Sequence, residues 1–74
     1  MAIDEMLEKA KEISNSAYAH DENAGRYQAV KNYQKASDEL APIMDEVMKL
    51  IDPRIIEILN INEDIGMQIK QLME

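Results

Sequence analysis

The one histidine of this chain lies beside two carboxylates in a short stretch, "HDEN", at residues 20–23. His20 beside Asp21 and Glu22 has the residue types of a catalytic pair or a metal site. Adjacent residues in a loop cannot both point at one reacting atom, and the sequence has no second histidine and no cysteine to complete either site. The stretch also lacks the spacing and central glycine of a calcium loop, and no glycine-rich phosphate loop is present. We therefore expect a solvated turn and a non-enzyme, with no catalytic residue, metal or cofactor.

A second kind of chemistry, apolar binding, is indicated in the last third of the chain. One helical stripe there has the composition of a core face and consists of Ile55, Ile58, Asn62, Ile65, Ile69 and Leu72. A neighbouring arc, offset from the stripe by about 100° on a helical wheel, is polar only in part. It consists of Ile56, Leu59, Glu63, Gly66, Met67, Lys70 and Met73. We interpret the arc as a candidate peptide-binding surface.

The composition of this arc supports that interpretation. Gly66 costs a helix about 1 kcal/mol relative to alanine, but it would let another backbone approach closely. Met67 and Met73 are adaptable contact residues of the kind found on binding surfaces. Together they outline a groove for a partner helix or an extended peptide, with acidic residues at its rim. Two other interpretations stay open, which are homodimerisation through the same face and coverage of the arc by the long second helix.

Three helices are expected to position this surface. Residues 3–19 form the first helix, with a stripe at Ile3, Met6, Leu7, Ala10, Ile13 and Ala17. The second spans residues 26–51, after a turn in which Gly25 can adopt conformations that other residues resist. The third spans residues 53–73, where Asp52 can cap and Pro53 suits the first helical position. Because the stripes need one another as partners, the sequence predicts a single all-α domain over residues 1–74, a three-helix bundle running up, down and up.

The second helix contains a proline inside its apolar pattern. The pattern steps by four and three residues along Ala29, Tyr33, Ala36, Leu40, Ile43, Val47 and Leu50. Pro42 interrupts this seam and normally costs about 3 kcal/mol in a helix interior. The seam keeps its phase across the proline, whereas two separate helices would be expected to reset it. We therefore predict one long helix, kinked near Pro42.

Composition excludes several classes of function. The net charge of −7 opposes binding to nucleic acid, and it would favour a basic peptide as partner or simply keep a small domain soluble. No apolar run is long enough for a spanning helix, and the N-terminus "MAIDEMLEK" lacks the apolar segment of a signal peptide. With no cysteine available for disulfides, we expect a cytoplasmic protein that does not insert directly into a membrane.

The stretch "AYAHDENAGRYQAVKNYQKASDEL" resembles the MIT (microtubule interacting and trafficking) domain. The positions that match the family are Ala17, Asp21, Gly25, Tyr27, Ala29, Tyr33 and Ala36. The resemblance covers about a third of the chain. A single tetratricopeptide-like hairpin would also explain "AVKNYQKA" followed by Pro42, but that architecture needs about three stacked repeats and the sequence has no second copy.

The resemblance implies a three-helix bundle that binds short tail motifs of ESCRT-type, membrane-remodelling filament subunits. In that family a helical motif lies between helices two and three, and an extended motif lies between helices one and three. Such domains usually sit at the end of a larger protein, so the chain is expected to be an excised module. The leading hypothesis is a peptide-binding adaptor that uses the groove on its third helix. The alternative is a self-associating structural or chaperone-like homodimer.

Overall fold

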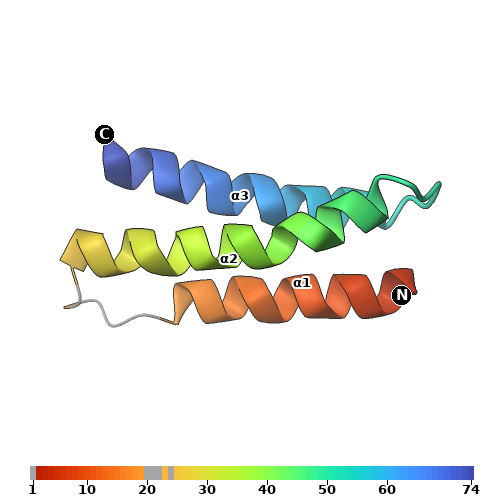
Figure 1. Cartoon of the computed structure of the whole chain (residues 1–74), viewed down its shortest axis with the longest axis horizontal. Helices are drawn as coiled ribbons and strands as arrows, with labels where there is room; N and C mark the ends of the chain where they lie inside the picture. The colour runs from red at the N-terminus through yellow and green to blue at the C-terminus, as the bar shows by residue number, and fades with distance from the viewer. Residues whose placement is uncertain (1, 20–22, 24) are drawn as a thin grey trace.

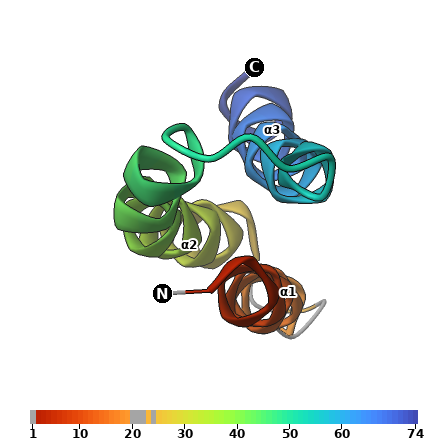
Figure 2. The ribbon, with the colours of Figure 1, turned by 90° about the vertical axis from the view of Figure 1, so that its right-hand side faces the viewer.

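The computed structural model describes residues 2–19, 23 and 25–74, and it consists of three helices packed side by side (Figure 1). They are α1 (Ile3–Tyr18), α2 (Gly25–Val47) and α3 (Ile55–Met73). The chain runs along the bundle in alternating directions, so its two ends lie at opposite ends of the molecule. Every pair of helices is in contact, and the view along the axis in Figure 2 places α2 next to both α1 and α3. The predicted up-down-up, three-helix bundle is confirmed.

One apolar core lies between the helices, and it is built from the predicted stripes. Its buried side chains are Met6, Ala10, Ile13, Ala17, Ala29, Tyr33, Ala36, Leu40, Ile43, Val47, Ile58 and Ile65. Among the described residues no polar or charged residue other than Tyr33 is buried. Partly buried apolar residues surround this core, and they include Ile55, Ile69 and Leu72 from the predicted stripe of α3. Asn62 is also half-buried.

Helices α1 and α2 owe their close packing to alanines. Each contributes two alanines to the core, and these short side chains let two backbones approach one another. The ring of Tyr33 fills the space beside them and meets the ring of Tyr18 edge to face, with ring centroids 5.3 Å apart. The contribution of α3 consists of larger isoleucines. The core is therefore tight between the first two helices and filled by aliphatic side chains from the third.

Helix α2 continues through Pro42, as predicted. Proline cannot donate a backbone hydrogen bond to the carbonyl of Asp38, and its ring crowds that carbonyl, which bends a helix. Figure 1 shows the second half of α2 running in a different direction from the first half. At the start of the helix, Gly25 has a φ of +85°, the left-handed conformation for which glycine is suited.

The predicted helix boundaries at the α2–α3 connection were wrong by several residues. The second helix was expected to reach residue 51, but α2 ends at Val47. The chain then continues with hydrogen bonds that span three residues instead of four. Lys49 N–H donates to the Glu46 carbonyl at 3.2 Å, and Leu50 N–H donates to the Val47 carbonyl at 3.0 Å. Pro53 further disfavours a helical conformation in the residue before it. Leu50 nevertheless packs against the core from outside the helix.

The other predicted ends differ by one or two residues. The first helix ends at Tyr18 instead of residue 19, and α3 begins at Ile55 instead of residue 53. The turn before α3 carries the capping expected of Asp52, whose Oδ1 accepts the backbone N–H of Arg54 at 2.9 Å. The backbone there makes i→i+3 hydrogen bonds, including Ile55 N–H to the Asp52 carbonyl at 3.1 Å. Pro53 thus lies in a tight turn that leads into the helix.

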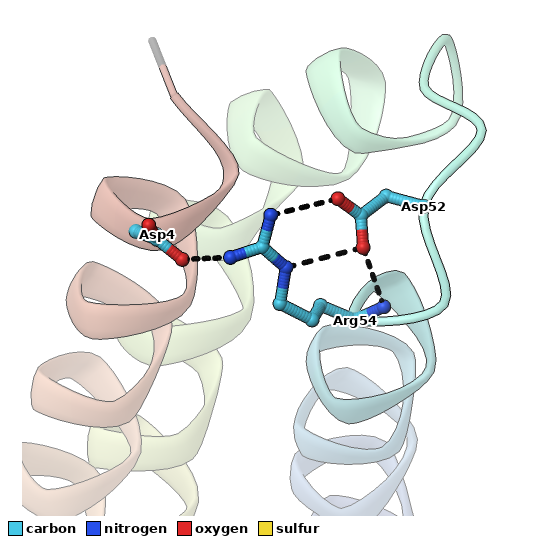
Figure 3. A network of polar contacts seen from close by, with 3 residues as sticks. All are labelled: Asp4, Asp52 and Arg54. Carbon is cyan, nitrogen blue, oxygen red and sulfur yellow. Dashed lines mark hydrogen bonds and ion pairs between the residues drawn. The ribbon is translucent and has the colours of Figure 1, made fainter.

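An arginine ties this turn to the start of α1 (Figure 3). The guanidinium of Arg54 donates to both carboxylate oxygens of Asp52, from Nε at 3.1 Å and from NH2 at 2.8 Å, and it also forms an ion pair with Asp4. These hydrogen bonds, from the side chain first and then from the backbone of Arg54, lower the pKa of Asp52 to about 2. The same carboxylates raise the pKa of Arg54. Since α3 begins directly after Arg54, this network links the start of α3 to the start of α1.

Within the described part of the chain, none of the three helices has the length and apolar character needed to cross a bilayer.

Candidate functional site

The predicted peptide-binding arc lies on the outer side of α3. Three of its large apolar side chains are exposed, with exposed fractions of 58% for Ile56, 50% for Met67 and 70% for Met73. Glu63, Gly66 and Lys70 are also exposed, and Leu59 is half-buried. The long second helix therefore does not cover the arc, which was the third interpretation of the sequence. Whether a peptide binds there stays a prediction.

The arc divides into two edges. By their helical positions, Leu59, Gly66 and Met73 follow one another at intervals of seven residues, so they share one side of α3. That side faces α2, because Met73 lines an open groove together with residues of α2. Ile56 and Met67 lie farther round the helix, away from α2. A partner helix placed against the first edge would have the glycine at the middle of its contact.

Gly66 has free space around it. A Cβ atom built on Gly66 would meet no heavy atom within 4 Å outside its immediate helical neighbourhood. Nothing in the described fold therefore requires a glycine at this position, although the residue is unfavourable in the middle of a helix. The close approach that glycine permits is not used inside the described chain. It is available to a second molecule.

The groove beside Met73 was missed by the sequence-based interpretation. It is lined by Arg26, Tyr27 and Val30 of α2 and by Leu72 and Met73 of α3. These α2 residues lie outside the core seam. Their spacing of three and four residues places them on one side of α2, and this spacing could have indicated a second surface on that helix. The fold brings them to α3 because the start of α2 lies beside the end of α3.

A cation–π contact between Lys31 and Tyr27 lies at the rim of this groove. Tyr27 is 77% exposed, and the Nζ of Lys31 lies 5.5 Å from the centroid of its ring. The lysine orients the ring without covering it. An aromatic face, an adaptable methionine and the cation of Arg26 therefore meet at one end of the α2–α3 side. This combination suits contact with an apolar segment that also carries a carboxylate or a backbone terminus.

Two other tyrosines, Tyr18 of α1 and Tyr33 of α2, have a structural role. The hydroxyl of Tyr18 donates a hydrogen bond to the carboxylate of Asp64, which joins the end of α1 to α3. Burial, followed by this hydrogen bond, raises the pKa of Tyr18, and burial also raises the pKa of Tyr33. Both phenols therefore stay protonated well above neutral pH. They hold helices together and are unsuited to accept a proton or attack as a nucleophile near neutrality.

The remaining candidate for chemistry lies outside the described residues. It consists of His20, Asp21 and Glu22, in the connection between α1 and α2. Asp21 is also the aspartate that matches the MIT family. Among the residues that the structure does describe, no three acidic or metal-ligating side chains form a cluster able to hold an ion.

Comparison of the chain with family models, with curated proteins and with solved structures finds no match. The resemblance to the MIT domain therefore stays a prediction from the residues between Ala17 and Ala36.

Proposed function

We propose that this chain is a non-catalytic protein-interaction module that binds a short segment of a partner protein on α3. The observation that carries the proposal is the exposure of Ile56, Met67 and Met73 on a helix whose other face already fills the core. A helix in a small bundle needs one apolar face to fold. The second apolar surface contributes nothing to the described core, and its burial by a partner would be favourable.

The dimensions of this surface suit a helical segment. From Ile56 to Met73 the helix rises by about 26 Å, at about 1.5 Å per residue. Gly66 lies near the middle, where a partner backbone could approach most closely. The α2–α3 groove at Met73 extends the surface onto a second helix, as in grooves that accept an amphipathic helix. The partner segment would therefore be a helix of about five turns with apolar residues on one side.

The finer identity of the partner rests on the resemblance to the MIT domain. That family binds short tail motifs of ESCRT-type subunits, with a helical motif between helices two and three. The open groove between α2 and α3 is in keeping with this mode. The net charge of −7 attracts motifs with basic residues to the molecule as a whole, while Arg26 in the groove itself would face a carboxylate of the motif. An adaptor role in protein transport in the cytoplasm is the corresponding cellular proposal.

The test is a titration of the protein with fluorescently labelled basic amphipathic helical peptides, followed by fluorescence anisotropy. The variant Met67→Asp should weaken binding at least tenfold, or about 1.4 kcal/mol, because it places a charge in a desolvated contact. Ile51→Asp is the matched control, since Ile51 is fully exposed on the α2–α3 connection and lies outside α3. Absence of binding, or equal weakening by the two variants, would contradict the proposal.

Self-association through the same surface is the alternative, and sedimentation decides between the two. The adaptor proposal expects a monomer across a hundredfold range of protein concentration. A dimer that Met67→Asp converts to a monomer would instead show that α3 binds a second copy of this chain. That result would replace the proposed function.

A further inference from the structure

The side of the bundle opposite the α2–α3 groove has a cleft of its own, between α1 and α2. It is lined by Met6 and Lys9 of α1 and by Glu39, Pro42, Ile43 and Glu46 of α2. Met6 and Ile43 are core residues that form its apolar floor, and the charged side chains form its rim. None of these residues belongs to the α3 surface. The cleft is therefore a separate feature of the molecule.

Pro42 in the wall of this cleft has no explanation in the core. Its side chain is exposed, so it does not add to the buried packing. A proline inside a helix removes one hydrogen bond and crowds the carbonyl four residues earlier, which here belongs to Asp38. That carbonyl is left without its usual helical N–H donor, next to the proline ring. The exposed proline ring is an apolar element of the kind with which a groove holds a peptide.

The charge around the cleft is strongly negative. The end of the bundle formed by residues 2–12 and 38–57 holds ten of the fifteen acidic residues of the chain and only four basic ones. Neither Glu39 nor Glu46 has an ion-pair partner within the described residues, although Lys9 lies on the same rim. The rest of the described chain is close to neutral. This potential attracts cations to one end of the molecule, and most strongly at low salt.

We propose that the α1–α2 cleft binds a basic peptide segment, with an apolar side chain against the exposed ring of Pro42, above the floor at Met6 and Ile43, and flanking cations at Glu39 and Glu46. The two glutamates are seven residues apart on α2, which separates them by about 10 Å along the helix axis. Three residues of a peptide in the polyproline II conformation span about 9 Å, and residues three positions apart point to the same side of that helix. Lysines or arginines three positions apart, with one apolar residue between them, therefore match the cleft.

The experiment uses three synthetic peptides of equal length and a protein with ¹³C-labelled methionine methyl groups. The first peptide contains Lys-Ala-Leu-Lys, the second replaces the leucine with alanine, and the third replaces both lysines with glutamate. The first should shift the methyl signal of Met6 in a saturable way. The second should bind at least fivefold more weakly, because the apolar contact is lost. The third should not bind.

A matched pair of protein variants tests the electrostatic part. Glu39→Lys with Glu46→Lys should weaken binding of the first peptide at least tenfold. Asp38→Lys with Asp45→Lys makes the same change in net charge one position earlier on the same helix, outside the cleft, and should weaken it less than threefold. Both double variants alter exposed side chains, and their helical circular dichroism and thermal unfolding verify that they fold.

Three results would overturn the proposal. One is a Met6 signal that does not move. Another is equal weakening by the two double variants, which would show attraction by net charge alone. The third is equal binding of the leucine and alanine peptides. If Met67 and Met73 shift while Met6 does not, the cleft is rejected but the proposed function of α3 is supported, so the two ideas can fail separately.

Discussion

Replacing Gly66 with alanine tests both the stability and the function of α3 in one variant. A glycine in the middle of a helix costs about 1 kcal/mol relative to alanine, and an added Cβ at Gly66 would meet open space. Gly66→Ala should therefore raise the free energy of unfolding by about 1 kcal/mol. For a domain of this size that corresponds to an increase in melting temperature of about 4–8 °C. Urea and thermal unfolding followed by circular dichroism measure both quantities.

Gly25→Ala is the matched control, because the same atom is added where there is equally free space. The difference is the backbone, since Gly25 has a φ of +85° whereas Gly66 is helical. An alanine held in the left-handed conformation loses about 1–2 kcal/mol. Gly25→Ala should therefore lower stability by about 1 kcal/mol while Gly66→Ala raises it. Two changes of the same sign would refute the argument.

The same variant has the opposite effect on binding if α3 accepts a closely packed partner. The new methyl group of Gly66→Ala would occupy the position where a partner backbone approaches. We expect the peptide affinity to fall by threefold or more while stability increases. A variant that is more stable and binds as tightly as the original protein would contradict the close approach at Gly66.

Three further predictions concern the core, the proline and acid stability. Ile65→Ala, at a fully buried position, should lower the free energy of unfolding in urea by about 2–5 kcal/mol, whereas Ile56→Ala at an exposed position should change it by less than about 0.5 kcal/mol. Pro42→Ala should raise it by about 2 kcal/mol, because the regained helical hydrogen bond outweighs the greater freedom of the unfolded chain. Because the folded pKa of Asp52 lies near 2, below its unfolded value, its contribution is complete above about pH 4 and is lost between about pH 4 and 2. Asp52→Asn should lack that part of the acid dependence, as unfolding at several pH values will show.

The core of the fold could be read from spacing because a helix repeats every 3.6 residues. Every residue of the seam from Ala29 to Val47 is buried, including those on both sides of Pro42. The end of α2 could not be placed in the same way. Leu50 keeps the apolar spacing and contacts the core, but the chain reaches it through a turn. Apolar periodicity reports which side chains are buried and not whether the backbone between them is helical.

Ile61 shows a second limit of reasoning on a single helix. It belongs to neither the predicted core stripe nor the predicted arc, yet it packs against the core. It also lines a shallow groove with Lys11 and Ser14 of α1. A helix with two neighbours buries a wider arc than one stripe contains. The width of that arc depends on where α1 and α2 lie, which a helical wheel does not contain.

The sequence by itself determined that this chain is an all-α bundle, which side of each helix is buried, and that α3 has more apolar surface than its own stripe needs. Local periodicity and glycine or proline chemistry are sufficient for these conclusions. Only the tertiary structure decided that the arc on α3 is uncovered and that Tyr27 and Met73 line the same groove. It alone placed the acidic rim of Glu39 and Glu46 over the floor formed by Met6. Such features join residues from different helices, so they follow from how the helices pack and not from any one segment.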